Sequence, residues 1–144
     1  MLGTGSRGNA VLFESGRSRL LVDAGFGVRT LEARLRAAGV APESVSACVI
    51  THEHVDHVRG AAPAAQQWGW ALHASEGTVR ACPALAGAGA TAFRAGDALA
   101  LDGFDVETTP TPHDAQIYTK FHTRRTFRRL KLVRSVLVQA TDGK

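Results

Sequence analysis

Two short apolar runs near the N-terminus predict a β-hairpin. They span residues 10–14 and 19–23, and the sequence Ser-Gly-Arg-Ser separates them. Apolar runs bounded by Gly and Ser are typical of strands, and so short a separation favours antiparallel pairing.

Residues 27–40 follow a helical period instead. Apolar side chains recur there at spacings of three and four, and Gly39 supplies a typical stop signal. The apolar run at residues 44–50 then predicts a short buried strand that ends where a group of histidines begins. Functional loops follow strand ends in α/β folds, so this junction is a candidate site.

Helices and strands alternate beyond the histidines. The predicted order is helix, strand, helix and paired strands, at residues 58–70, 71–75, 76–87 and 90–115. Pro63 interrupts or starts the first of these helices, and Asp102 with Gly103 forms the turn of a hairpin. The sequence has no internal repeat, and its mixed order predicts the α/β fold class.

The composition fits one soluble domain in the cytoplasm. The 144 residues are 44% apolar and 21% charged, and no apolar run is long enough to span a membrane. The N-terminal sequence MLGTGSRGN lacks the basic and apolar regions of a secretory signal. Cys48 and Cys82 are far apart, which argues against a thiolate metal site or a disulfide framework and favours two core thiols.

The composition changes sharply after Ala115. Residues 116–144 hold eight of the 17 Lys and Arg residues but one of the 13 Asp and Glu residues. We therefore expect a domain at residues 1–115 and an atypical basic segment at residues 116–144. This segment admits two interpretations: a basic helix leading into a strand at residues 136–140, or a non-native stretch from a gene fusion or a frame change. Its charge suits either contact with nucleic acid or a solvated surface.

The sequence THEHVDH at residues 51–57 concentrates potential metal ligands. Imidazole and carboxylate groups bind zinc and similar ions. His52 and His54 stand two apart beyond an extended segment and therefore project to the same side, where one ion can take both. Asp56 and His57 lie further along the turn and suit a second ion nearby, as in two-metal hydrolytic sites.

Three further residues accompany this group. His113, at another predicted strand end, is the expected third ligand of the first ion. Glu53 falls between the ligands and is expected to be a solvated carboxylate. Asp23, at the end of a predicted strand, suits two roles equally well, a hydrogen bond to a ligand histidine or the capping of a turn.

Four motifs occur in an order that resembles the metallo-β-lactamase fold. THEHVDH resembles its HxHxDH signature, and GTGSRGN, LLVDAGF and TPHDA are similar to motifs of its cytoplasmic YycJ/WalJ-like branch. The resemblance covers residues 2–115 and implies roughly the N-terminal half of a four-layer αββα sandwich. Because the family's first strand normally precedes the Gly-rich loop, the resemblance also implies that Met1 is an internal or misassigned start.

The resemblance implies two divalent metal ions, with zinc as the default and manganese as the alternative. The ligands of the first ion correspond to His52, His54 and His113. Those of the second ion correspond to Asp56 and His57. QATDGK is similar to the family's later ATD motif, which makes Asp142 the candidate that bridges the two ions. The family's final histidine ligand belongs to a second half that falls beyond Lys144.

These features predict a metallo-hydrolase that cleaves a phosphodiester with a metal-bound hydroxide, which Asp56 helps to orient. The resemblance implies nucleic acid as the substrate, with DNA exonuclease action as the specific expectation. Hydrolysis of a thioester, a lactone or a small phosphodiester remains an open alternative. A third alternative, suggested by the absent final ligand, is a metal-binding but inactive fragment. The sequence predicts no particular oligomeric state.

Overall fold

The computed structural model of the chain describes residues 1–3, 5–110 and 117–123. His113 and Asp142 therefore lie outside the described residues, as does most of the basic segment. No helix within the described ranges is long and apolar enough to cross a lipid bilayer.

A five-stranded sheet lies at the centre of the molecule, in the order β1-β2-β3-β4-β5. β1 and β2 pair antiparallel, and the other neighbours pair parallel. The strands are β1 Val11–Ser15, β2 Ser18–Val22, β3 Ala47–Ile50, β4 Ala71–Ser75 and β5 Thr91–Phe93. The predicted N-terminal hairpin is therefore confirmed, as are the predicted strands at residues 44–50 and 71–75.

A second, antiparallel sheet contains β6 Ala98–Leu101, β7 Phe104–Pro110 and β8 Ile117–Thr123. Gly103 has a φ of 85°, which suits the predicted hairpin turn between β6 and β7. β8 pairs with β7 along its whole length. Residues 117–123 are thus a strand, where one interpretation of the basic segment expected a helix.

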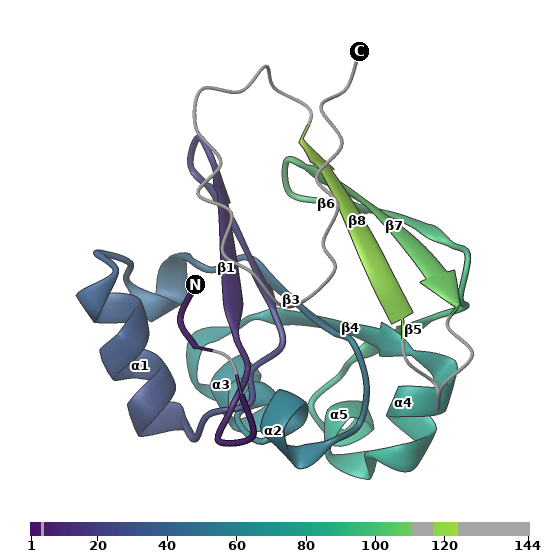
Figure 1. Ribbon diagram of the computed structural model, residues 1–144, viewed down its shortest axis with the longest axis horizontal. Helices are drawn as coiled ribbons and strands as arrows, with labels where there is room; N and C mark the ends of the chain where they lie inside the picture. The colour runs from purple at the N-terminus through teal and green to yellow at the C-terminus, as the bar shows by residue number, and fades with distance from the viewer. Residues whose placement is uncertain (4, 111–116, 124–144) are drawn as a thin grey trace.

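Strand periodicity explains why the two sheets and the helices form layers. Leu20 and Val22 of β2 contribute to an apolar cluster with Phe104 and Val106 of β7, so these sides of the two sheets face each other. The intervening Leu21 belongs to a second cluster, which includes the buried residues of the helices. The result is a helix–sheet–sheet arrangement, three of the four layers of an αββα sandwich (Figure 1).

The helices cover one face of the five-stranded sheet. They are α1 Val28–Ala37, α2 Val55–Val58, α3 Ala61–Trp68, α4 Glu76–Ala81 and α5 Pro83–Gly87, and a short 3-10 helix spans Pro42–Ser44. Leu31 and Leu35 bury the predicted apolar face of α1, and Gly39 ends this helix with a φ of 77°. Trp68 and Trp70 pack together in the same cluster.

The single helix predicted at residues 76–87 is wrong in one respect, because the structure divides it into α4 and α5. Cys82 stands between them with a φ of −125° and a ψ of 84°, outside the helical region. Pro83 follows it, and a proline disfavours the helical conformation of the residue before it. Pro83 then occupies the first turn of α5, where its missing N–H costs nothing.

Parallel pairing brings several strand ends to one edge of the sheet. β2, β3 and β4 are parallel neighbours, so their carboxyl ends lie side by side. Asp23 follows β2, and Thr51 and His52 follow β3. The histidine-rich segment therefore begins at the edge where α/β folds place their ligands.

Candidate functional site

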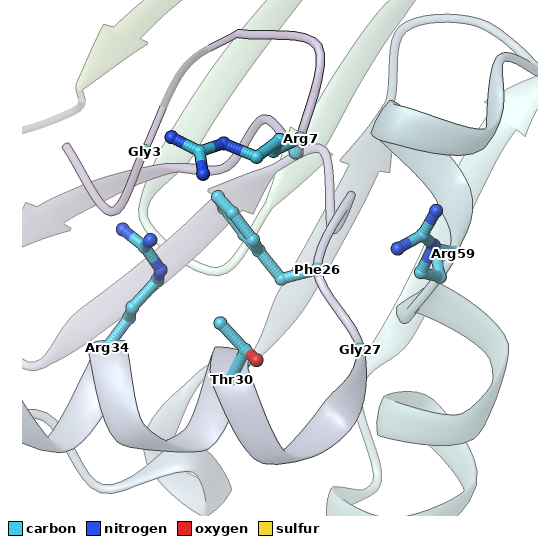
Figure 2. A pocket seen from close by; sticks show the side chains of 8 residues that line it. Gly3, Arg7, Phe26, Gly27, Thr30, Arg34 and Arg59 are labelled. Atoms are coloured by element: carbon cyan, nitrogen blue, oxygen red, sulfur yellow. The ribbon is translucent and has the colours of Figure 1, made fainter.

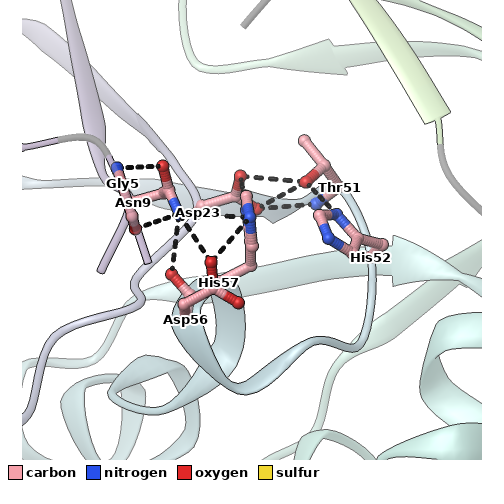
Figure 3. A network of polar contacts seen from close by, with 7 residues as sticks. All are labelled: Gly5, Asn9, Asp23, Thr51, His52, Asp56 and His57. Carbon is pink, nitrogen blue, oxygen red and sulfur yellow. Dashed lines mark hydrogen bonds and ion pairs between the residues drawn. The ribbon is translucent and has the colours of Figure 1, made fainter. Parts of the chain in front are cut away.

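Asp23 lies at the centre of a buried hydrogen-bond network at this edge (Figure 3). Its carboxylate accepts a bond from the Thr51 backbone N–H at 2.8 Å and contacts the Thr51 hydroxyl at 2.9 Å. The same carboxylate lies 2.7 Å from Nδ1 of His57. Only 1% of the Asp23 side chain is exposed, so these partners replace water for a charged group that is costly to bury unpaired. Asp23 thus makes the hydrogen bond to a histidine that one of its two predicted roles requires, while the metal-ligand role of that histidine stays a prediction.

The backbone of Asp23 is in the left-handed region, with a φ of 61°. It is the one non-glycine residue in the described ranges with a positive φ. Aspartate and asparagine tolerate this conformation better than other residues with a Cβ, and such strain is frequent at functional sites. The conformation is held from both sides, because Asp23 N donates to Val49 O and Ala24 N donates to His57 O.

The contact with Asp23 determines how His57 presents its ring. A carboxylate only accepts hydrogen bonds, so Nδ1 of His57 carries the proton and donates to Asp23. In the neutral ring Nε2 then carries no proton, so its lone pair can accept a hydrogen bond or bind a cation. Burial lowers the pKa of His57, but the hydrogen bond and charge of Asp23, with a smaller contribution from Asp56, raise it above the ordinary value of 6.5 overall.

The Thr51 hydroxyl orients His52 in a similar way. Its oxygen lies 2.9 Å from Nδ1 of His52 and within bonding distance of both Asp23 oxygens. Because Asp23 can only accept, the hydroxyl donates to Asp23 and accepts from Nδ1–H of His52, which again leaves Nε2 as the nitrogen without a proton. Burial lowers the pKa of His52, and the nearby His57 and His54 lower it further against the opposing charges of Asp23 and Glu53.

The three imidazole rings lie close together. The ring centre of His52 is 3.9 Å from that of His57 and 4.6 Å from that of His54. Asp56 Oδ2 is 3.5 Å from Nε2 of His57. The structure therefore brings together the four sequence-predicted residues at positions 52, 54, 56 and 57, while His113 and Asp142 cannot be placed because they lie outside the described residues.

Asn9 links two of these groups, and the sequence analysis did not single it out. Its side-chain nitrogen lies 3.1 Å from Asp56 Oδ2 and 3.2 Å from Nε2 of His57. Its backbone N–H donates to the Asp56 carbonyl oxygen at 2.8 Å. The available signal was its position at the end of the GTGSRGN motif, two residues before β1.

Glu53 differs from its predicted solvated state. Its Oε2 atom is buried and has no hydrogen-bond partner among the described residues. A buried carboxylate oxygen without a donor is unfavourable, and a cation nearby is one way to compensate it. The buried Glu53 oxygen is therefore consistent with a site that binds a cation.

The donor set fits divalent metal ions, although no three of the described His, Cys, Asp or Glu side chains are arranged to hold an ion as they stand. Two imidazoles have their Nδ1 atoms engaged, which is the usual orientation of ligand histidines that bind through Nε2. The Asn9 amide nitrogen lies between His57 and Asp56, and its two hydrogens can bond to His57 Nε2 and Asp56 Oδ2.

Comparison with known proteins identifies the superfamily. The family model described as "Metallo-beta-lactamase superfamily" matches residues 3–128, so the chain belongs to this superfamily. Solved structures agree on the fold: the subclass B3 metallo-beta-lactamase MEM-A1 from a soil metagenome library has a TM-score of 0.64 at 19% identity. That match covers 81% of this chain and 56% of MEM-A1. The expected fold class is thereby confirmed.

Curated relatives are similar to the chain within the branch that its motifs resemble. The exodeoxyribonuclease WalJ of Streptococcus pneumoniae serotype 2 is 32% identical over 121 residues, which cover 80% of this chain and 45% of that protein. The exodeoxyribonuclease YycJ of Bacillus anthracis is 32% identical over 139 residues, covering 92% of this chain and 52% of YycJ. The chain thus spans about half the length of the curated relatives it matches.

Proposed function

We propose that this chain belongs to a metal-dependent phosphodiesterase that degrades DNA as an exonuclease. One observation carries the proposal: the Asp23 carboxylate and the Thr51 hydroxyl hold Nδ1 of His57 and His52, which leaves Nε2 of each ring as its metal-binding nitrogen, and the two ring centres lie 3.9 Å apart. The similarity to WalJ and YycJ, which are named exodeoxyribonucleases, supports DNA as the substrate.

The donors divide into two groups suited to two ions. For the first ion we assign His52, His54 and His113, and for the second Asp56 and His57, with Asp142 as the bridging carboxylate. Imidazole nitrogen favours zinc, whereas the carboxylates also admit manganese. Ions bound there supply an acidified water as the nucleophile near neutral pH and neutralise the charge that develops on phosphate oxygens.

The described residues have separate tasks in this proposal. Asp23 holds the His57 ring, and its negative charge makes Nε2 a stronger donor to a cation. The Thr51 hydroxyl, which is bonded to Asp23, holds the His52 ring in the same way and also strengthens its Nε2 as a donor to a cation. Asp56, whose side chain is 26% exposed, can both bind a cation and accept a proton from water at Oδ2, which makes it the candidate that orients the nucleophile.

The experiment uses the 144-residue chain, stripped with a chelator and then loaded with zinc or manganese. End-labelled DNA, bis-p-nitrophenyl phosphate and a thioester are offered in parallel, and bound metal is measured by plasma mass spectrometry. We expect metal-dependent shortening of the DNA from an end, no turnover of the thioester, and loss of both binding and activity in His52→Ala with His57→Ala. Turnover of the thioester alone would replace the proposal with the thioesterase alternative, and bound metal without any turnover would favour the inactive fragment.

A further inference from the structure

A cavity of about 410 Å³ lies next to the histidine site, between the Gly-rich loop and α1 (Figure 2). Its lining comprises Gly3, Arg7, Gly8, Phe26, Gly27, Thr30, Arg34 and Arg59. We call it the arginine pocket. Its volume is in the range of ligand sites, about 300–1,000 Å³, so it has room for more than a single ion.

The charge of the arginine pocket is entirely positive. Three of its eight lining residues are arginines, and none is an aspartate or glutamate. Among the described residues, the arginines for which an ion pair is seen are Arg19, Arg36 and Arg94, none of which lines the pocket. Guanidinium groups that converge without a carboxylate repel each other, and an anion between them relieves that repulsion.

Arg34 forms a fixed wall of the pocket. Its guanidinium lies 4.3 Å from the centre of the Phe26 ring and donates from Nη1 to the carbonyl oxygen of Leu2. A guanidinium has five N–H donors, so this bond leaves others for a ligand. The fixed position matters because less side-chain freedom is then lost when an anion binds.

The loop across the pocket is also held in place. A Cβ atom on Gly3 would lie 2.5 Å from the Phe26 ring, and one on Gly8 would lie 2.6 Å from it. Both glycines therefore allow the loop to lie directly on the ring, and Gly8, with a φ of 150°, also adopts a conformation that favours glycine. Figure 2 shows Arg7 reaching from this loop over Phe26 toward Arg34, while Arg59 lies beyond the backbone segment that carries Phe26 and Gly27.

The first turn of α1 adds to the positive potential. α1 begins after Gly27 with no side-chain cap and no acidic residue in its first turn. The N-terminal N–H groups of a helix attract anions, and here Thr30 of the first turn lines the pocket. A helix N-terminus and guanidinium groups are both usual donors to a phosphate group.

The pocket and the histidine site share their supporting segments. Gly8 directly precedes Asn9, which contacts His57, and Arg59 follows His57 by two positions. The Gly60 N–H donates to Ala24 O, which ties the segment after Arg59 to the segment after Asp23. A chain of phosphates that reached the histidines could therefore extend into the pocket.

We propose that the arginine pocket binds a phosphate group of the nucleic-acid strand, away from the phosphodiester that reacts at the histidines. This inference rests on the proposed function, because the nucleic-acid strand in the pocket is the substrate of the proposed nuclease. Arg7, Arg34 and Arg59 contact the phosphate oxygens, and the pocket fixes the register of the strand without reading its bases.

The test measures DNA binding without cleavage, so that its failure is distinct from failure of the nuclease proposal. A fluorescent single-stranded oligonucleotide is titrated with the 144-residue chain in chelator, at several salt concentrations, and binding is followed by anisotropy. The variant is Arg7→Gln with Arg59→Gln. The matched control is Arg17→Gln with Arg80→Gln, which removes the same charge from two exposed arginines outside the pocket.

We expect the pocket variant to bind about ten-fold more weakly and its salt dependence to fall by about one counterion, because the pocket then neutralises its one phosphate much less. The control should change the affinity by less than about three-fold. Circular dichroism melts verify that both variants are folded, and the charge reversal Arg59→Glu should weaken binding more than Arg59→Gln does.

Equal weakening by both double variants would overturn the inference, because DNA would then respond to net charge alone. Competition identifies the source of the phosphate. We expect an unlabelled oligonucleotide to compete far better than inorganic phosphate or a mononucleotide. A pocket-dependent response to inorganic phosphate or mononucleotide with no oligonucleotide binding would also overturn the inference and leave a site for small phosphates. Cleavage by the metal-loaded chain is scored separately.

Discussion

Gly25 lies against Asp56 with no space between them for a side chain. A Cβ atom on Gly25 would overlap the carbonyl oxygen of Asp56 and lie 2.7 Å from the backbone nitrogen of Asn9. The neighbouring atoms are backbone, so they cannot move aside as a flexible side chain could. The loop after β2 thus holds α2, and with it His57, in place by direct contact.

Gly25→Ala should therefore destabilise the fold by at least about 2 kcal/mol, because the clash forces backbone shifts in a packed region. Urea unfolding measures the loss. Gly87→Ala is the control, since a Cβ there has no atom within 4 Å and an alanine suits the end of α5. The control should be neutral or slightly stabilising, by up to about 1 kcal/mol. Equal stabilities for the two variants would contradict the packing described for Gly25.

Asp23→Asn should weaken metal binding by about 10–100-fold, because the charge behind His57 is lost while the side chain still tolerates a positive φ. Asp23→Ala should be worse in stability as well, since alanine tolerates that conformation poorly and leaves the Thr51 groups unpaired. Competition with a zinc-binding dye measures affinity, and thermal melts measure stability. An affinity for Asp23→Asn equal to that of the unaltered chain would show that Asp23 does not act through His57.

In metal-free protein His57 should titrate above pH 6.5 and His52 below it, in the directions of their pKa shifts. Folding raises the pKa of His57, so the folded state holds more protons than the unfolded chain just above pH 6.5. The stabilisation from the protonated His57–Asp23 pair is thus complete below pH 6.5 and is lost as the pH rises through the folded pKa.

Carbon-edited NMR of the imidazole C–H groups, in chelator, follows each ring, with His57→Gln for assignment. Asp23→Asn should lower the pKa of His57, since it removes the charge that raises it. A His57 resonance that titrates below pH 6.5 in the unaltered chain would contradict the described contact.

Thr51→Val should cost about 1–3 kcal/mol, because it keeps the shape of the side chain but leaves a buried carboxylate without one of its donors. It should also free the His52 ring, which then exchanges between its two neutral tautomers. Nitrogen NMR of the metal-free protein detects this as averaged imidazole shifts. Thr51→Ser, which keeps the hydroxyl, should retain the Nδ1–H form, and the same averaging in both variants would refute the proposed role of the hydroxyl.

Much of the fold was predictable because its signals are local. The hairpin at β1 and β2 and the helix α1 each follow from a period and a turn residue within about fifteen positions. The break between α4 and α5 was missed, although Pro83 marks it, because the apolar residues on both sides continue the helical spacing. At Cys82 the effect of the following proline on the backbone outweighed the helical spacing of the apolar residues.

The candidate metal ligands could be named from the sequence, but the residues that contact and orient them could not. His52, His54, Asp56 and His57 stand within six positions, and their chemistry is explicit in the sequence. Asn9 and Thr51 are ordinary residues whose roles depend on which segments become neighbours in space. The burial of Glu53 Oε2 likewise depends on packing that no local pattern encodes. The same holds for the three arginines, Arg7, Arg34 and Arg59, that line one cavity.

Asp23 and Thr51 stand 28 positions apart and meet because β2 and β3 pair side by side. The orientation of both imidazoles therefore exists in the native chain and not in the unfolded one. An ion held by those rings selects the native chain, and its binding energy adds to the energy that opposes unfolding. The amount of intact protein that a cell accumulates should then rise with the supply of zinc or manganese in its medium.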